Sequence, residues 1–347
     1  MSSWQLRTAI IRISILLGIF FLENSGALGQ VSGIITAPNG KPLNKAEVFI
    51  NRTTLGSMTD EFGQFTLIDV PPGLHELVAY KEGYPIYRAP MRVQEGRTYS
   101  LNLKLSPPEK KQKGKTTPEA IAGFSHALLG DDGLILFKNE KQVQVLQENG
   151  KFRVLSGPVV IEYPNAGYRI TGYFNSMAFQ DISEAAFQYQ EYHGADVNQN
   201  ISFEKTRMTL FRGSLRHLLM AMTAGKSSEE GFMLKDAQGN SIDGRTLVTP
   251  SGISGYFKIR FDPSLTVVYK AESSTLTATD PIDANILGVM INPKILAISG
   301  AMNKSGIAYQ LPMDYLPISD DVETTYAEAK SNFSHYAAFL KKMASYI

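Results

Sequence analysis

The sequence of 347 residues contains no cysteine. Without thiols the chain has no disulfide framework, no cysteine nucleophile and no zinc site built from thiolates. The apolar segment near the N-terminus also lacks the cysteine on which a bacterial lipoprotein would be acylated. The absence of cysteine therefore excludes these kinds of chemistry and argues against a lipid anchor.

Other catalytic signatures are missing too. None of the five histidines has a glutamate three residues further on, as the zinc pair of a metallocarboxypeptidase requires, and no Gly-x-Ser-x-Gly turn occurs. Gly225-Lys226-Ser227 lacks the earlier glycine of a phosphate-binding loop, because Met220 stands there. We expect no catalytic, cofactor-binding or metal-binding residues, no cofactor, and a protein that is not an enzyme.

One short motif has part of the spacing of a calcium-binding loop, at Asp196, Asn198 and Asn200. Such a loop also needs glycine at its sixth position and glutamate at its twelfth. Ile201 and Arg207 occupy those positions. We interpret the motif as a polar turn.

No apolar run outside the N-terminus is long enough to cross a membrane. Arg7 and Arg12 supply a positively charged region before a ten-residue apolar core at 13–22. This core is too short to span a bilayer comfortably. A small-x-small cleavage site follows at 27–29. We interpret residues 1–29 as a secretory signal peptide, with an uncleaved anchor as the alternative. The mature chain is then exported to the periplasm, the outer-membrane periphery or the extracellular space, with no transmembrane segment.

The charge of the mature chain is balanced. Removal of Arg7, Arg12 and Glu23 with the signal peptide leaves 32 basic and 32 acidic side chains. A nucleic-acid binder needs a basic surface, so we expect no nucleic-acid partner.

Residues 30–105 have the pattern of a small β-sandwich. β-Prone runs alternate with strong turn signals such as Asn39-Gly40, and Pro71-Pro72 ends one of the runs because proline cannot donate to a strand ladder. The predicted strands cover 31–37, 46–51, 55–59, 64–70, 74–80, a segment ending near 93, and 98–105. We therefore predict a seven-stranded antiparallel sandwich.

The same stretch resembles the carboxypeptidase regulatory-like domain, a transthyretin- or prealbumin-like sandwich found in secreted proteins of Gram-negative bacteria. The motif residues that carry the resemblance are Asp60, Gly63, Phe65, Pro71, Pro72, Gly73, Gly83 and Tyr84. Asp60 to Gly63 is a turn in which Gly63 takes a positive φ. The resemblance implies a fold and not an activity, so we expect all eight residues to build the sandwich.

Residues 106–123 are polar and bounded by proline, which predicts a flexible linker. Residues 124–347 mix β and α signals and are predicted to form a larger β-rich α+β domain of unknown function. Strands are expected at 133–138, 142–146, 152–155, 159–163 and 168–174, and as a hairpin of 255–261 with 265–270, whereas 185–192 and 201–210 are ambiguous. The complete chain is predicted to be mainly β.

Two amphipathic helices are expected in this second region. Phe211, Leu215, Leu218, Leu219 and Met222 share one helical face, followed by Gly225 as a C-terminal cap. A second helix is predicted from Asp320 or Asp321 to about Met343.

The second region also resembles, more faintly, the uncharacterised tail of secreted proteins that begin with this module. The matching residues are Asn165, Gly167, Tyr168, Ile170, Arg212, Gly213, Ser214, His217, Leu219, Glu230, Gly231, Phe232, Leu311, Pro312, Tyr315 and Pro317, whereas Ala166 and Leu218 depart from the pattern. Among these, Arg212 and His217, together with Arg216, could bind an anion, although side chains lying along the core with their charges in water are favoured. Ser214 and His217 could face each other, but no carboxylate accompanies them.

Two classes of function remain for an exported chain of this kind. The favoured one is a secreted or periplasmic, non-enzymatic envelope protein with a structural or protein-interaction role. The alternative is a carbohydrate-binding module protein of a glycan-use system, because related sandwiches are starch-binding-like. Its stacking residues would be Tyr84, Tyr87 and Tyr99. The expected partner is an envelope protein or a glycan.

Overall fold

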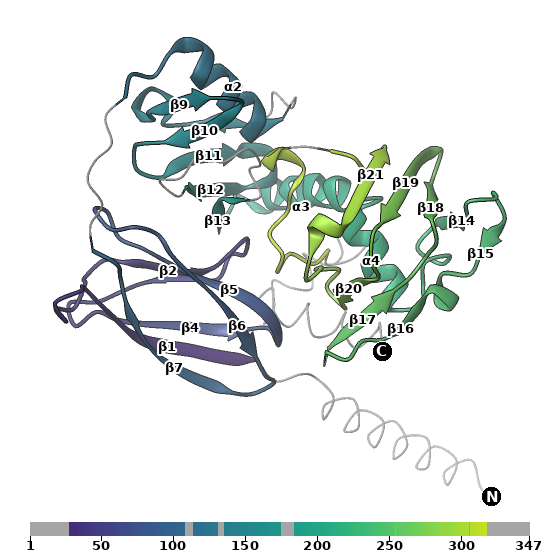
Figure 1. Ribbon diagram of the computed structural model, residues 1–347, viewed down its shortest axis with the longest axis horizontal. Coiled ribbons are helices and arrows are strands. Elements are labelled where there is room, and N and C mark those ends of the chain that lie inside the picture. The colour runs from purple at the N-terminus through teal and green to yellow at the C-terminus, as the bar shows by residue number, and fades with distance from the viewer. Residues whose placement is uncertain are drawn as a thin grey trace, which may run out of the picture. The chain divides into compact units, whose positions relative to one another are not determined.

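The computed structural model in Figure 1 describes residues 28–107, 114–130, 135–174, 184–253, 255–304 and 306–317. The described residues from Leu28 to Pro317 belong to one compact unit. The apolar core of the predicted signal peptide and the predicted last helix lie outside the described residues. In the described part of the chain, no helix combines the length and the apolar content that crossing a membrane would require.

Seven strands in two sheets form the N-terminal module (Figure 1). They are β1 (Gly29–Thr36), β2 (Glu47–Ile50), β3 (Gly56–Met58), β4 (Gln64–Val70), β5 (Gly73–Tyr80), β6 (Tyr87–Val93) and β7 (Thr98–Lys104). One sheet has the order β4-β1-β7 and the other β3-β2-β5-β6. Buried side chains such as Val31, Ile35, Val48, Phe65 and Leu77 fill the core. The seven predicted strands are confirmed.

The prediction that this module is antiparallel throughout is wrong for one pair. β1 and β7 run parallel, with Gln30 opposite Thr98 and Thr36 opposite Lys104. β6 and β7 belong to different sheets, so the connection between them carries the chain across the sandwich instead of back along a neighbour. β7 therefore arrives beside β1 in the same direction.

The turn before β4 shows why the motif residues are needed there. The Asp60 carboxylate accepts from the backbone N–H groups of Phe62 (2.9 Å) and Gln64 (2.8 Å). Gly63 has a φ of +73°, and a Cβ at this position would lie 2.6 Å from the carbonyl oxygen of Ile35. Phe65 then points into the core. Local hydrogen bonding and lack of space both select this sequence.

A first group of elements follows the module. It consists of α2 (Pro118–Leu129), β8 (Leu136–Phe137), η1 (Glu140–Gln142), β9 (Val145–Glu148), β10 (Lys151–Val154), β11 (Val159–Tyr163), η2 (Pro164–Ala166), β12 (Tyr168–Tyr173) and β13 (Ala186–Glu191). β13, β12, β11 and β8 form one sheet in that order, and β9 and β10 form a hairpin. Helix α2 packs with these strands through Phe124 and Leu128.

The predicted linker is shorter than residues 106–123, because α2 begins at Pro118. Thr117 caps the helix by accepting from the N–H of Ala120 (3.2 Å), and proline is well suited to the first helical position. Because residues 106–123 are mostly polar, the sequence pattern places the helix start at Thr117 and Pro118 within the linker.

A second group of elements completes the described chain. It consists of α3 (Val197–Phe211), α4 (Leu215–Thr223), β14 (Phe232–Lys235), β15 (Ser241–Ile242), η4 (Gly244–Leu247), β16 (Val248–Pro250), β17 (Tyr256–Ile259), β18 (Ser264–Tyr269), β19 (Glu272–Ala278), β20 (Ile282–Asn285), η5 (Pro293–Ile295), β21 (Leu296–Gly300) and η6 (Ile307–Tyr309). The sheets have the orders β15-β14-β18-β19-β21 and β16-β17-β20. Strands predominate, so the mainly β fold class with a β-rich α+β second region is confirmed.

The predicted hairpin of 255–261 with 265–270 is wrong, although both strands exist. β17 pairs with β16 and β20, whereas β18 pairs with β14 and β19. The chain reverses one strand later, after β18, where Lys270 has a φ of +55°. The segment between β17 and β18 instead joins two different sheets.

The predicted helical face that starts at Phe211 is divided between two helices. Phe211 ends α3, Gly213 has a φ of +74°, and Ser214 caps α4 by accepting from the N–H of His217 (3.2 Å). The face on Leu215, Leu218, Leu219 and Met222 packs into a core cluster as predicted. Gly225 follows the end of α4 with a φ of +68°.

Replacement of Gly63 tests the turn before β4. We expect Gly63→Ala to destabilise the protein by about 3 kcal/mol, because it adds both a left-handed backbone and a contact with a carbonyl oxygen. Gly40→Ala is the matched control, since Gly40 also has a positive φ (+83°) but no atom within 4 Å of the added Cβ. This control should cost about 1 kcal/mol. Urea unfolding measures both values, and equal losses would contradict the steric argument.

Candidate functional site

The loop between β2 and β3 is held on one side by strand β13. Thr53 forms a parallel bridge with Gln188, and the N–H of Tyr189 donates to the carbonyl of Thr53 (3.0 Å). The N–H of Arg52 donates to the carbonyl of Phe187 (2.7 Å), and Arg52 has a φ of +62°. We call residues 51–54 the joint loop. It attaches the module to the sheet of β13 by backbone hydrogen bonds.

The other side of the joint loop is held by the segment at 310–315. The N–H of Thr54 donates to both carboxylate oxygens of Asp314 (3.1 and 3.0 Å), and the Thr54 hydroxyl donates to the same carboxylate. The N–H of Met313 donates to the carbonyl of Arg52 (2.7 Å). The Arg52 guanidinium donates to the Gln310 side chain (2.6 Å). Burial raises the pKa of Asp314 despite these hydrogen bonds and the nearby Arg216 charge.

Arg216 holds the same segment from the side of α4. Its guanidinium donates to four backbone carbonyls, those of Leu287 (2.9 Å), Pro312 (2.8 Å), Met313 (2.6 Å) and Tyr315 (2.7 Å). Burial lowers the pKa of Arg216 to about 10. The expectation that this side chain extends its charge into water is therefore wrong. Four of its donors fix the position of the chain next to Asp314, while Arg212 is exposed.

Three of the residues that resemble the uncharacterised tail, Gly167, Tyr168 and Tyr315, lie around the network of Arg207, a cation that is only 2% exposed. Its guanidinium pairs with Glu191 (2.5 Å), donates to the carbonyl of Ala166 (2.7 Å) and lies 4.2 Å from the ring centre of Tyr168. The hydroxyl of Tyr315 donates to Glu204 (2.6 Å), which also faces Arg207. These residues build a buried network.

Like Arg207, His217 is buried and its ring is held by contacts with neighbouring residues. His217 Nδ1 accepts from the N–H of Gly213 (3.1 Å), and Nε2 lies 3.2 Å from the carboxylate of Glu230. Ser214 bonds the backbone of His217 and not its ring. The expectation that no carboxylate accompanies this pair is wrong, because Glu230 lies beside His217, but Ser214 and His217 are not arranged as a nucleophile and its base.

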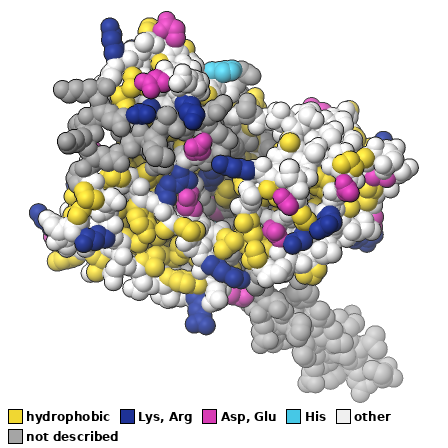
Figure 2. Space-filling view, in the orientation of Figure 1, with side chains coloured by type: hydrophobic (Ala, Val, Ile, Leu, Met, Phe, Trp, Pro, Cys, Tyr) yellow, Lys and Arg dark blue, Asp and Glu magenta, His cyan; other side chains and the backbone are white. Residues whose placement is uncertain are grey.

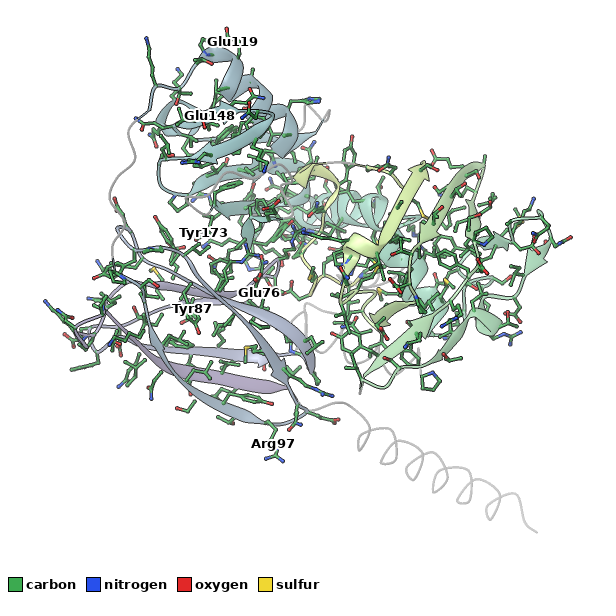
Figure 3. All side chains as sticks on the ribbon, viewed as in Figure 1. Glu76, Tyr87, Arg97, Glu119, Glu148 and Tyr173 are labelled. Carbon is green, nitrogen blue, oxygen red and sulfur yellow. The ribbon has the colours of Figure 1, made fainter. Side chains whose placement is uncertain are left out.

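One face of the module's larger sheet is covered by the sheet of β12 and β13. Phe49 and Val78 pack against Tyr173 and Ala186, and the rings of Phe49 and Tyr173 are 5.0 Å apart. Figure 3 labels Tyr173 on the side of its sheet that faces β2 and β5. The hydroxyl of Tyr173 donates to the carboxylate of Glu47. The packing of these two sheets adds to the attachment that the joint loop makes between the module and β13.

A polar pocket of about 420 Å³ opens beside this contact. Its wall is formed by Lys45, Glu47, Tyr80, Lys81, Glu82, Asn139, Gln142, Ser156, Gly157 and Pro158. Burial, together with the charges of Glu82 and Glu47, raises the pKa of Tyr80 to about 12. The pocket is thus lined by carboxylates, ammonium groups, two amides, a hydroxyl group and one aromatic ring.

The eight motif residues are dispersed over the module and do not form one site. Asp60 and Gly63 form the turn before β4, which contains Phe65, and Pro71 and Pro72 lie between β4 and β5, which begins at Gly73. Gly83 has a φ of +87°, and Tyr84 packs against the module core.

The proposed stacking residues do not form exposed platforms. Tyr84, Tyr87 and Tyr99 are all half-buried and pack on the core of the module. Figure 2 shows hydrophobic side chains gathered over this part of the molecule. The three rings therefore contribute to folding, and only part of each is accessible.

The residues with the most specific contacts were not found from the sequence. Asp314 and Thr54 are 260 positions apart and belong to no motif that indicates an interaction. Within the described ranges, no group of three or more His, Asp or Glu side chains is arranged to hold a metal ion. The contacts described here join the module to the second region and fix the position of the backbone, and the polar pocket has room for a ligand.

The pH dependence of stability tests the environment of Asp314. Because the pKa of Asp314 is raised in the folded state, the wild type loses stability relative to Asp314→Asn as the pH rises from the ordinary aspartate value through the raised one. Asp236→Asn is the control with the opposite sign, since hydrogen bonds from Asn240 lower the pKa of Asp236. Urea unfolding between pH 3 and 7 measures both differences. If the wild type instead gains stability relative to Asp314→Asn as the pH rises, the hydrogen bonds from Thr54 and the charge of Arg216 outweigh burial.

Comparison with known proteins gives one family. The sequence model of the carboxypeptidase regulatory-like domain matches residues 30–106. No curated protein matches the chain.

Matches among solved structures have low similarity. A type II cohesin–X-dockerin complex from Acetivibrio cellulolyticus has 21% identity, covering 30% of this chain and 78% of the other, with a TM-score of 0.22. A DUF3823 family protein from Parabacteroides merdae has 10% identity, covering 48% and 100%, with a TM-score of 0.20. A putative carbohydrate binding protein from Bacteroides uniformis has 9% identity, covering 79% and 100%, with a TM-score of 0.20. These values add nothing to the description of this chain. The family match and the two-sheet architecture together identify the N-terminal sandwich, residues 30–106, as a carboxypeptidase regulatory-like domain.

Proposed function

We propose that this protein is an exported, non-catalytic binding protein of the cell envelope, with a structural or protein-interaction role. The observation that supports this proposal is the joint loop, whose hydrogen bonds to β13 and to Asp314 fix the module to the rest of the described chain. Rigid attachment is useful for presenting a surface at a defined position, because less freedom is lost on binding. The ionisable groups around the joint loop serve to hold backbone in place.

The proposed contact surface is the outer face of the sheet β4-β1-β7. The outer face of the other sheet is covered by Tyr173 and Ala186. Among the described residues, the outward side chains of this sheet are Gln30, Ser32, Ile34, Thr36, Gln64, Thr66, Ile68, Thr98, Ser100, Asn102 and Lys104. The charged side chains there are Lys104 and Asp69, which is exposed next to Ile68 in β4, and Ile68 is 62% exposed. Protein interfaces are depleted in charge at their centre, so this face suits a protein partner.

Site-specific photo-crosslinking in the native host tests this role. A photoreactive residue at Ile68 is expected to give one discrete envelope adduct. The same residue at Met233, which is 57% exposed in β14, is the control and should give none.

Mass spectrometry of the purified chain should find Gln30 as the first residue. Adducts at neither position, or an intact N-terminus in the cytosol, would contradict the proposal.

Carbohydrate binding is a second candidate, and the polar pocket supports it. Sugar sites combine an aromatic ring with amide and carboxylate groups, and here Tyr80, Gln142 and Glu82 face one pocket. The side chains of Gln142 and Glu82 are exposed. The candidate site for a glycan is therefore this pocket and not the three tyrosines proposed from the sequence.

A glycan array with purified mature protein tests this candidate. We expect the affinity for any bound sugar to fall about tenfold in Gln142→Ala, because one hydrogen-bonding group is removed. Gln238→Ala, in an exposed turn outside the pocket, should bind as the wild type. No bound sugar, or binding that Gln142→Ala leaves unchanged, would argue against this pocket as a sugar site.

A further inference from the structure

A second cavity, of about 320 Å³, lies at the turn between β4 and β5 and shares no residue with the polar pocket. Its walls come from the module, from strands β17 and β20, from the segment at 287–291 that follows β20, and from the segment at 313–314. Most of the wall is apolar and is formed by Pro71, Leu74, Pro90, Leu287, Val289, Met290, Ile291 and Met313. The volume corresponds to about ten water molecules, or to a small organic ligand.

Polar atoms gather around Gly73, next to the cavity wall. A methyl group built on Gly73 would lie 3.6 Å from Tyr256 Oη, 3.8 Å from Asn285 Nδ2 and 3.9 Å from His75 Nε2. Tyr256, Asn285 and His75 all line the cavity. The motif glycine leaves open the space between these atoms.

The orientation of Asn285 is fixed by its own hydrogen bonds. Its Oδ1 accepts from the N–H groups of Leu287 and Val289, both at 3.0 Å, so Nδ2 must be the remaining group. Among the described residues, Nδ2 has no acceptor, although Asn285 is only 7% exposed. Every fully shielded side-chain nitrogen or oxygen in that part of the chain has a partner, so Nδ2 reaches the cavity.

The neighbouring polar groups complete a donor pair. Tyr256 Oη accepts from the N–H of Leu74 (3.1 Å), and its own hydrogen has no acceptor within the described ranges. His75 Nε2 lies 2.7 Å from the carbonyl of Pro71 and therefore carries the proton, and burial lowers the pKa of His75. The neutral ring is thus held in place by the backbone. Two donors, from Asn285 and Tyr256, remain for a ligand.

The charges on the wall are engaged elsewhere and do not favour an anion. Glu76, labelled in Figure 3, pairs with Arg88 (2.8 Å). Asp314 accepts from Thr54, and Arg52 donates to Gln310 (2.6 Å). With two acidic groups and one basic group on the wall, a carboxylate ligand would gain no net attraction.

We propose that this cavity binds an uncharged carbonyl group attached to a short aliphatic body, with the carbonyl oxygen accepting from Asn285 Nδ2 and Tyr256 Oη. The aliphatic part lies against Leu287, Met290 and Met313. An acylated amine and an aliphatic residue of a peptide share this chemistry. The cavity wall includes Arg52 and Thr53 of the joint loop and Asp314, on which the proposed function also rests, whereas the two donor residues, Asn285 and Tyr256, take no part in the joint-loop contacts.

A ligand-observed NMR titration of the full mature chain with N-acetyl-leucine methylamide tests the site. The size of this probe leads us to expect saturable binding with a Kd of about 1 mM. Val289→Phe fills the cavity and should abolish binding, and Ile291→Trp is the second blocking variant if the first does not fold. Asn285→Asp keeps the acceptor oxygen, removes the donor and should weaken binding about tenfold. Asn292→Asp makes the same change outside the cavity and should have no effect.

Three results would overturn the assignment. They are the absence of saturable binding to the wild type, wild-type affinity in a folded blocking variant, and tighter binding of N-acetyl-leucine, whose carboxylate is charged. A comparison with N-acetyl-Ala-Leu-Ala amide then identifies the source. Tighter binding of this peptide supports a polypeptide ligand, and weaker binding supports a small acylated amine.

Discussion

The hydrogen bonds of the joint loop are the interaction on which the rest of the structure depends. Four residues of the module, 51–54, bond to β13 on one side and to Met313 and Asp314 on the other. Bringing Thr54 to Asp314 closes 260 residues of chain, and the entropy of that closure must be offset by contacts formed together. Each hydrogen bond contributes only about 1 kcal/mol. The attachment is therefore stable because backbone pairing, the Asp314 carboxylate and the covered sheet face act at the same place.

The module was predictable because its signals are local. Alternating side chains and turn residues such as those at 60–63 act within a few positions, and all seven strands formed where these patterns placed them. The second region gave weaker signals for a physical reason. In β13 the residues 186–189 are all buried, so alternation disappears, and in α3 the buried face includes Glu204 and Arg207. Charged residues inside a helix interface remove the periodicity by which such a helix is recognised.

The joint could not be derived from the sequence, because it depends on three distant segments. Nothing around Asp314 indicates that its carboxylate accepts from Thr54, and nothing around Arg216 indicates four carbonyl acceptors. The resemblance to an uncharacterised tail did select Gly167, Tyr168 and Tyr315, which meet around Arg207 and Glu204. Their role is to satisfy buried charges, which a sequence pattern alone does not reveal.

The module forms one wall of each of the two cavities. Lys45, Glu47 and Tyr80 form one side of the polar pocket, and Pro71, Leu74 and His75 form one side of the apolar cavity. In both cases the opposite side comes from the second region, so neither cavity exists in the module alone. A rigid joint keeps both walls at fixed separation before a ligand arrives, which lowers the entropy lost on binding. Under both binding proposals, the module therefore helps to determine which ligand fits, through the cavity shape that it completes.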